Sequence, residues 1–161
     1  MTSKDECQSF EIGIRKRIAL VAHDNKKSEL IEWVKRNHDQ LILHELHATG
    51  TTGSLIETVL GIPVIKYKSG PLGGDQQLGA KIAEQSIDML IFIADPLEAQ
   101  PHDSDIRALT RLASVWNIPM ACNLSTADFL LTSPYMINTY KRIVPTFEHY
   151  LKRNIKINES H

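Results

Sequence analysis

The sequence predicts a single α/β domain of the doubly wound, Rossmann-like kind, in which helices flank a five-stranded parallel sheet. Apolar, β-branched segments alternate about five times with segments of helical periodicity, which is the pattern of a parallel sheet covered on both faces. The chain has 161 residues, of which 42% are hydrophobic and 23% are charged. These values fit one ordinary globular domain with a substantial core.

The five expected strands are short apolar segments. The first, 17–22, reads RIALVA, and the segment 87–95, IDMLIFIAD, is the most apolar and is expected to be a central strand. The other three are expected in the segments 41–50, 62–68 and 118–124.

Helical patterns separate these strands. Leu30, Ile31 and Val34 share one face of a helix that follows the first strand. Gly61 is expected to end the second helix. Later in the chain, one helical face carries five apolar residues: Ile106, Leu109, Leu112, Ala113 and Trp116. The remaining helices are expected over the segments 51–61, 75–85, 126–133 and 146–153.

The predicted domain spans residues 17–151. Residues 1–16 form a polar leader that carries no motif, and residues 152–161 form a polar C-terminal tail.

Composition argues against several classes of partner. The formal net charge is −1, so no overall basic field favours nucleic acid or an anionic membrane. No apolar run approaches the roughly 20 residues that span a bilayer, and the N-terminus lacks a signal-peptide core. Cys7 and Cys122 are far apart and show no zinc-ligand spacing. We therefore expect a cytoplasmic protein without a metal site.

The polar motifs follow strands. In open parallel sheets, ligands bind at the carboxyl ends of the strands, near the point where the strand order reverses. The segments 23–24, 49–52, 69–75 and 95–105 each follow a predicted strand, so we expect them to gather at one edge of the sheet.

The segment 48–53, ATGTTG, leads from a strand into a helix. Backbone N–H groups at a helix N-terminus bind phosphate, and Thr49, Thr51 and Thr52 add hydroxyl donors beside Gly50. A threonine that simply caps the helix is an equal alternative.

The segment 69–75, SGPLGGD, is a glycine-rich loop. Ser69 and Gly70 offer a hydroxyl and a backbone N–H to the same phosphate, and the glycines allow a ligand to approach the backbone closely. Asp75 is either the N-cap of the following helix or a base held against a substrate; taken alone, the motif favours the cap.

Two further segments carry polar groups. Lys27 lies near a helix start, where the dipole disfavours a cation, and a bound anion would explain it. The loop 95–105 places His102 among several aspartates, including Asp105. A histidine there can donate to or accept from a substrate oxygen.

Seven strings in chain order closely resemble the methylglyoxal synthase family. They read VAHD, ATGTTG, SGPLGGDQQ, FIADPL, PHDSDIRAL, VWNIP and STADF. The resemblance runs from about residue 17 to about residue 131, and the ordered set is far more specific than any one string.

The resemblance implies a carbon–oxygen lyase that converts dihydroxyacetone phosphate to methylglyoxal and inorganic phosphate without a metal or an organic cofactor. It assigns the catalytic base to Asp75, a contact with the substrate oxygen to His102, and supporting roles to Asp24 and Asp105. Substrate and phosphate contacts are assigned to eight residues: His23, Lys27, Thr49, Gly50, Thr51, Thr52, Ser69 and Gly70. It also implies a homohexamer in which a C-terminal arginine, here Arg153, reaches a neighbouring site.

The residues suit this chemistry. A positioned carboxylate typically contributes about 10²- to 10⁴-fold as a general base. Expulsion of phosphate from the resulting enediolate needs donors for the departing charge, and the same donors would bind free phosphate, so we expect product inhibition.

Two alternatives stay open. One is a non-catalytic regulatory module of the same fold that binds a phosphorylated metabolite and leaves Asp75 as a cap. The other is an isomerase, which would reprotonate the enediolate and form glyceraldehyde 3-phosphate.

Overall fold

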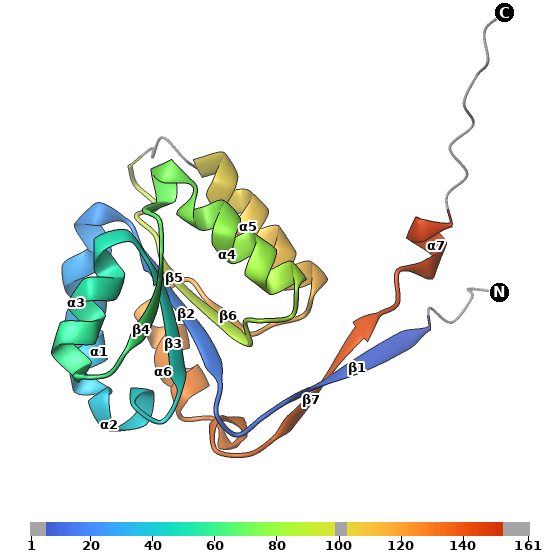
Figure 1. The fold of residues 1–161 in the computed structure, drawn as a ribbon, viewed down its shortest axis with the longest axis horizontal. Coiled ribbons are helices and arrows are strands. Elements are labelled where there is room, and N and C mark those ends of the chain that lie inside the picture. Colours follow the sequence, from blue (N-terminus) through green and yellow to red (C-terminus); the bar gives the residue numbers. More distant parts are fainter. Residues whose placement is uncertain (1–5, 99–102, 153–161) are drawn as a thin grey trace, which may run out of the picture.

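The structure, a computed structural model, describes residues 6–98 and 103–152, and for residues 103–105 it describes the backbone alone. Its centre is a five-stranded parallel sheet of strand order β4-β3-β2-β5-β6 (Figure 1). The strands are β2 (Arg17–Ala22), β3 (Glu45–Thr49), β4 (Val64–Tyr67), β5 (Met89–Ile93) and β6 (Met120–Ala121). The strand order reverses between β2 and β5, so the doubly wound prediction is confirmed.

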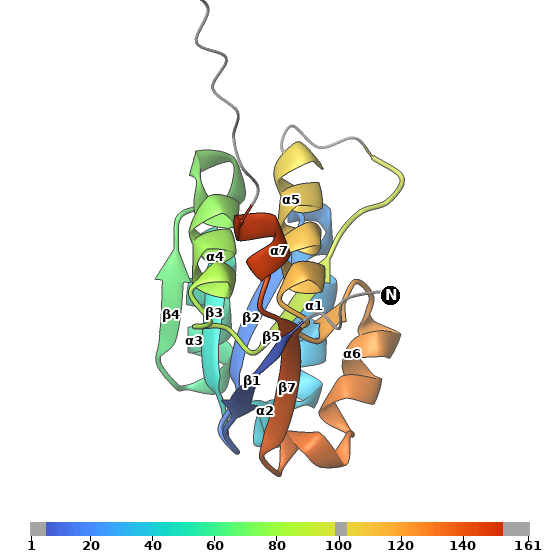
Figure 2. The ribbon, with the colours of Figure 1, turned by 90° about the vertical axis from the view of Figure 1, so that its right-hand side faces the viewer.

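Helices cover both faces of the sheet. One face packs against α1 (Lys27–Arg36), α2 (His38–Leu41), α3 (Gly50–Leu60) and α6 (Leu124–Leu131). The other packs against α4 (Gly74–Ala83) and α5 (Asp103–Val115), which stand in front of the sheet in Figure 2. Short 3₁₀ turns lie at η1 (Asp24–Lys26), η2 (Gly70–Leu72) and η3 (Pro134–Met136).

The core explains why β2 and β5 are apolar over most of their length. In β2, Ile18 and Leu20 belong to the cluster beneath α1 and α3, whereas Ala19 and Val21 belong to the cluster beneath α4 and α5. A strand that is buried on both faces has no solvent-facing positions for polar residues. Gly61 adopts a left-handed conformation at the end of α3, as its position in the sequence predicts.

The expected second strand begins later than predicted. Leu41 ends α2, and the backbone N–H of His44 donates to its carbonyl oxygen at 3.0 Å. The apolar residues 41–43 therefore belong to a helix end and a turn, and the strand begins only at Glu45. A short apolar run does not by itself distinguish these two states.

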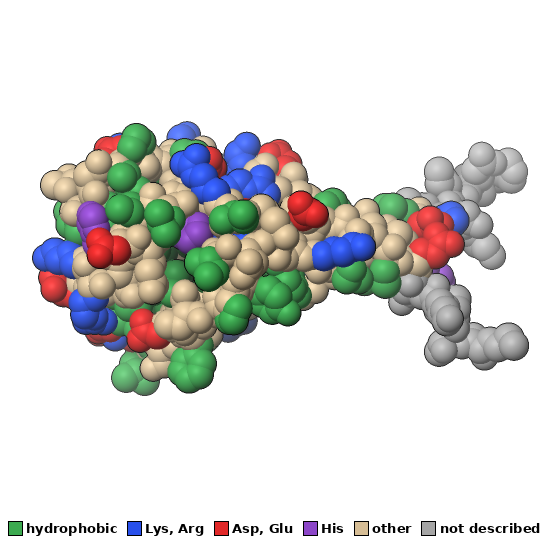
Figure 3. Space-filling view, turned by 90° about the horizontal axis from the view of Figure 1, so that it is seen from below, with side chains coloured by type: hydrophobic (Ala, Val, Ile, Leu, Met, Phe, Trp, Pro, Cys, Tyr) green, Lys and Arg blue, Asp and Glu red, His purple; other side chains and the backbone are tan. Residues whose placement is uncertain are grey.

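A two-stranded antiparallel arm lies outside the sheet. It pairs β1 (Cys7–Ile12) with β7 (Tyr140–Pro145), and α7 (Glu148–Leu151) follows it. In Figure 3 it extends from the body as a narrow projection. Neither strand is predicted from the sequence, because each segment has its partner more than a hundred residues away. The pairing ties part of the predicted leader to the domain.

Side chains alternate along the arm. Arg142 is buried on its inner face, with its guanidinium 5.1 Å from the ring centroid of Phe10. The same guanidinium donates to the carbonyl oxygen of Trp116 and to Oε1 of Gln85, at the ends of α5 and α4. These bonds attach the arm to the body. Cys7, on the outer face, and Cys122 are exposed and are not joined by a disulfide.

Within residues 6–98 and 103–152, no helix is long and apolar enough to cross a bilayer. In the same part of the chain, no three His, Cys, Asp or Glu side chains are grouped as ligands of a metal ion.

Candidate active site

A pocket of about 140 Å³ lies at the carboxyl ends of β2, β3 and β4. It brings together four segments that are distant in the sequence, as the edge rule predicts. Its lining is Val21, Ala22, His23, Asp24, Lys27, Thr49, Gly50, Thr52, Ser69, Gly70, Pro71, Asp75 and Phe92.

His23 follows β2 directly and is held in one orientation. Its backbone N–H donates to the carbonyl oxygen of Ile93 at 3.1 Å, and its ring meets Phe92 edge to face. Nδ1 accepts a hydrogen bond from the backbone N–H of Asp95 at 2.8 Å, so a neutral His23 ring carries its proton on Nε2. His23 is 4% exposed.

Asp95 stands beside this histidine but in a different environment. Its carboxylate accepts from the backbone N–H of Leu97 at 2.9 Å and from the side chain of Asn25. These two bonds hold the pKa of Asp95 below its usual range, so the group is ionised at neutral pH. A stabilised, partly exposed carboxylate of this kind is poorly suited to removing a proton from carbon.

Lys27 is the first residue of α1 and is fixed by two partners. Its Nζ lies 2.8 Å from Oδ1 of Asp24 and donates to Oγ1 of Thr51 at 3.1 Å. Asp24 offsets the unfavourable position of a cation at a helix start. Thr51 is itself exposed, and its hydroxyl orients the ammonium group.

The β3–α3 turn brings a buried hydroxyl to the pocket. Thr49 is the N-cap of α3 but makes no capping hydrogen bond with its side chain, so the capping alternative does not explain it. Thr52 is 1% exposed, and its Oγ1 is buried without a hydrogen-bond partner among the described residues. A buried hydroxyl in a pocket wall without a protein partner is a natural contact for a ligand.

Gly50 lets two turns come close together. Its φ is +55°, and a Cβ at this position would lie 3.2 Å from the Cα of Ser69. Its backbone N–H donates to the carbonyl oxygen of Lys68 at 3.3 Å. The threonine turn and the glycine loop therefore form one continuous wall.

The glycine loop places Asp75 in the pocket. A Cβ on Gly74 would lie 1.8 Å from the carbonyl oxygen of Lys68, so only glycine allows the first turn of α4 to pack against the end of β4. The N-cap of α4 is Gly73, in a left-handed conformation, and Asp75 is the second helical residue. Asp75 is thus not the N-cap, and its side chain is 2% exposed.

Three helices begin at this pocket, at Lys27, Gly50 and Gly74. Each N-terminus presents backbone N–H groups and the positive end of a helix dipole. Together with the Lys27 ammonium group, they make the pocket a site for an anion such as phosphate.

The structure thus gathers nine of the predicted site residues in the pocket lining, and Thr51 contacts one of them, Lys27. His102 and Arg153 lie outside the described residues, and Asp105 is described only by its backbone in α5. The end of α5 that carries Asp105 lies beside the N-terminus of α4 in both Figure 1 and Figure 2.

Pro71 and Phe92 also line the pocket, although sequence analysis did not select them. Phe92 is apolar and lies inside a buried strand, so no local signal distinguishes it from core. Only its position near the carboxyl end of β5 indicates that Phe92 lines the pocket.

Comparison with known proteins agrees with this geometry. The family model of the MGS-like domain matches residues 29–122. The methylglyoxal synthase of Coxiella burnetii is 60% identical over 140 residues, which cover 87% of this chain and 98% of the relative. That of Proteus mirabilis is 55% identical over 145 residues, covering 90% and 95%.

The crystal structure of methylglyoxal synthase from Elizabethkingia anophelis superimposes with a TM-score of 0.86 at 55% identity, covering 92% of this chain and 97% of that one. Similarity of this extent covers most of the chain and its fold. The chain belongs to the methylglyoxal synthase family.

Proposed function

We propose that the pocket converts dihydroxyacetone phosphate to methylglyoxal and inorganic phosphate, and that Asp75 is its base. The observation that carries the proposal is the burial of one carboxylate, 2% exposed, in a pocket on which three helix N-termini and a lysine converge. A phosphorylated substrate with an acidic C–H bond fits both features.

The phosphate group is proposed to bind between the threonine turn and the glycine loop. Lys27 supplies a positive charge, Thr49 and Thr52 supply hydroxyls, and Ser69 and Gly70 complete the wall. The buried Oγ1 of Thr52 gains a partner when phosphate binds. Charge-assisted hydrogen bonds are the strong ones in such a site.

Asp75 then takes a proton from the carbon that bears the hydroxyl group. Negative charge develops on the carbonyl oxygen, and a donor aimed at that oxygen stabilises the transition state. His102 is proposed for this role, with Asp24, Asp105 and His23 around the substrate. Of these, Asp24 and His23 line the pocket.

Elimination completes the reaction. The enediolate electrons expel phosphate by breaking the bond between carbon and the bridging oxygen, and the enol product takes up a proton as it becomes methylglyoxal. One terminal carbon is oxidised while the other is reduced, so the electrons balance within the substrate. Phosphate held by the same donors is proposed to act as an inhibitor.

The test is to incubate the purified protein with dihydroxyacetone phosphate and to measure methylglyoxal and phosphate in parallel. We expect equal amounts of both from the native chain. Asp75→Asn should lower turnover by about 10²- to 10⁴-fold. The matched control is Asp39→Asn, because the Asp39 side chain is 98% exposed and lies on α2, outside the pocket.

Other outcomes would contradict the proposal. Phosphate binding without either product would favour the regulatory module, and glyceraldehyde 3-phosphate in place of methylglyoxal would favour an isomerase. If Asp75→Asn kept native turnover, Asp75 would not be the base.

We also propose a homohexamer in which Arg153 serves a neighbouring site. Exposed apolar side chains support a contact surface between subunits: Tyr135 is 59% exposed, Ile137 69% and Ile143 47%. Light scattering should give about six times the chain mass of 18.2 kDa, and a monomer would contradict this.

We also propose a cytoplasmic location. Two exposed cysteines that are not joined by a disulfide support it, and cell fractionation would test it.

A further inference from the structure

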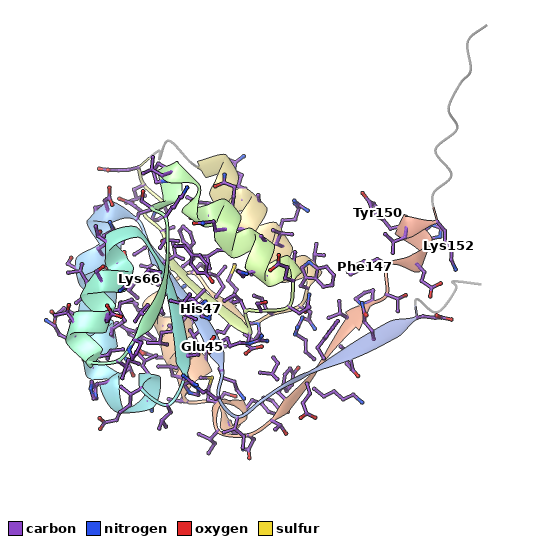
Figure 4. All side chains as sticks on the ribbon, viewed as in Figure 1. Glu45, His47, Lys66, Phe147, Tyr150 and Lys152 are labelled. Atoms are coloured by element: carbon purple, nitrogen blue, oxygen red, sulfur yellow. The ribbon has the colours of Figure 1, made fainter. Side chains whose placement is uncertain are left out.

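The side chains of Glu45, His47 and Tyr67 form a chain of hydrogen bonds beneath α4, in which His47 is buried and the other two are partly exposed. Nε2 of His47 lies 2.9 Å from Oε1 of Glu45, and Nδ1 lies 2.8 Å from the hydroxyl of Tyr67. The rings of His47 and Tyr67 are stacked, with centroids 5.9 Å apart. Figure 4 shows Glu45 and His47 on β3, with Lys66 on the adjacent strand.

Both ring nitrogens of His47 are used, which fixes the direction of each bond. His47 is 4% exposed, and burial lowers its pKa below the usual value although Glu45 acts in the opposite direction. The ring is therefore neutral at neutral pH. The Glu45 carboxylate accepts from Nε2–H, so Nδ1 accepts from the Tyr67 hydroxyl.

Tyr67 stands at the border of the proposed phosphate site. It is the last residue of β4 and pairs in register with Thr49. The next residue, Lys68, accepts from the N–H of Gly50 and donates its own N–H to Oε1 of Gln77 at 2.9 Å. Ser69 follows at once. The end of β4 thus sets the position of the glycine loop relative to the threonine turn and to α4.

We propose that His47 and Tyr67 are positioning residues for substrate binding: their hydrogen bond fastens the end of β4 to β3 and so holds Ser69 and Gly70 at the distance from Thr49 that the phosphate group needs. This inference rests on the proposed function. Neither residue lines the pocket. Their effect is therefore on affinity for the phosphorylated substrate, and the chemical step is affected little.

The opposite face of β4 offers a matched control. There Lys66 pairs with Glu57 of α3, and both side chains are more than a third exposed. This ion pair also joins β4 to its neighbours, but it is screened by solvent and does not lie beneath α4. Removing the Lys66–Glu57 ion pair tests whether any weakening of the contacts of β4 lowers the affinity for substrate.

The first experiment compares Tyr67→Phe with Glu57→Gln. Tyr67→Phe removes one hydroxyl and keeps the ring. Loss of this partly buried hydrogen bond should raise the KM for dihydroxyacetone phosphate, and the Ki for inorganic phosphate, by about five- to tenfold. We expect kcat to stay within about twofold and Glu57→Gln to keep native values for all three constants.

The second experiment uses pH to separate this role from simple packing. Lowering the pH from about 7.5 to below the folded pKa of His47, which burial holds under its usual value, protonates the ring, after which Nδ1 no longer accepts from Tyr67. The native chain then loses the bond that Tyr67→Phe already lacks. The ratio of the two KM values should therefore fall towards one. Ionisation of the substrate phosphate cancels in this ratio.

The charged groups around the Glu45–His47–Tyr67 relay do not reverse the lowering of the His47 pKa. Glu45, Arg17 and Asp88 act on His47, from β3, β2 and the segment before β5. Burial raises the pKa of Tyr67, on which Glu45 and Glu84 act in the same direction, so its hydroxyl stays protonated throughout the pH range.

Failure of the inference and failure of the proposed function give different results. If the native chain forms no methylglyoxal, the proposed function fails. If the native chain is active but Tyr67→Phe matches Glu57→Gln in KM and Ki, the positioning role is wrong. A lower melting temperature with unchanged KM, or a KM ratio that is constant with pH, would likewise overturn it.

Discussion

The two ends of the five-stranded sheet each hold a cavity, and the cavities differ in kind. The pocket at the carboxyl ends measures about 140 Å³ and is lined largely by polar and glycine residues. The cavity at the amino ends is larger, about 250 Å³, and mainly apolar. Its lining includes Ile12, Met89, Ile118, Leu130, Met136 and Tyr140.

The amino-end cavity also contains charged residues, but these are already engaged within the protein. Lys16 donates to the carbonyl oxygens of Gly13 and Asn138, and burial lowers its pKa. Asp88 forms a bidentate pair with Arg17, with its closest contact at 2.8 Å. Within the described residues, no α-helix begins at a residue that lines this cavity.

The functional site is therefore identified by the arrangement of its hydrogen-bond donors, and the larger volume of the amino-end cavity does not mark a second site. Every β–α crossover of a parallel sheet starts at the carboxyl ends of the strands, so the helix N-termini collect there. The larger amino-end cavity lies where chain segments pack on apolar surface. Changes at the two ends should therefore have separable effects.

The largest effect is expected from Gly74→Ala, at the carboxyl end. The new Cβ would meet the carbonyl oxygen of Lys68 at 1.8 Å, so α4 must move and carry Asp75 with it. Overpacking of this kind typically costs about 1–3 kcal/mol of stability, and a shift of about 1 Å in a reacting group can cost about 10²-fold in rate. Steady-state kinetics and thermal unfolding measure both effects.

Gly79→Ala is the matched control on the same helix. Its Cβ would meet only Cδ1 of Leu112, at 3.1 Å, which is the mobile end of a side chain. This variant should keep nearly native turnover. Equal losses in the two variants would show that the helix as a whole, and not the approach of Gly74 to β4, controls the site.

A smaller and different effect is expected from Met136→Ala, at the amino end. Met136 is 4% exposed and lines the mainly apolar cavity, so the truncation removes buried apolar contacts and enlarges the cavity. Substitutions of this type cost about 2–5 kcal/mol of unfolding free energy. Chemical denaturation should reveal this loss while KM and kcat remain native. A raised KM in Met136→Ala would contradict the expectation that changes at the amino ends affect stability without affecting substrate binding.

The smallest effect concerns pH and His44, also near the amino ends. Nδ1 of His44 accepts from the backbone N–H of Lys16 at 3.0 Å. Burial, with the charges of Lys16 and Arg15, lowers its pKa below 6.5. The unfolded chain thus binds a proton near pH 6.5 that the folded chain does not, so stability is lost as the pH falls through this range.

Melting temperatures between about pH 7.5 and about pH 5.5 should show this loss. His44→Asn keeps an acceptor oxygen close to the position of Nδ1 and does not titrate, so its melting temperature should fall less with pH. His38→Asn is the control, because the His38 side chain is 43% exposed. A native pH response in His44→Asn would assign the loss to other groups, of which buried His47 is one with the same sign.

Much of the site could be predicted from the sequence. The strands of the sheet contain apolar runs, and each polar motif follows a strand, so the gathering of His23, Thr49 and Ser69 at one edge follows from topology. The glycines of the segment 69–75 and the ordered family strings pointed to Asp75. What remained open was whether Asp75 caps its helix, because capping and catalysis use the same residue at the same place.

Other features had no local signal. Glu45 and His47 alternate with apolar residues as in any half-buried strand, and only the packing of β4 beside β3 shows that Tyr67 completes the relay. The arm was missed for a similar reason: Lys141 and Arg142 make β7 look like a polar tail until Phe10 and Glu11 are placed opposite them.

The sequence by itself determined the order of the five sheet strands and of most of the helices between them, and the residue types at the carboxyl ends, because these depend on periodicity and on glycine at fixed places. Only the tertiary structure decided which groups are buried and which already have partners. Lys16 and Lys27 look alike in the sequence, yet one is bound to carbonyl oxygens at the amino end and the other faces the pocket. Contacts between residues far apart in the chain make that difference, and local patterns do not encode them.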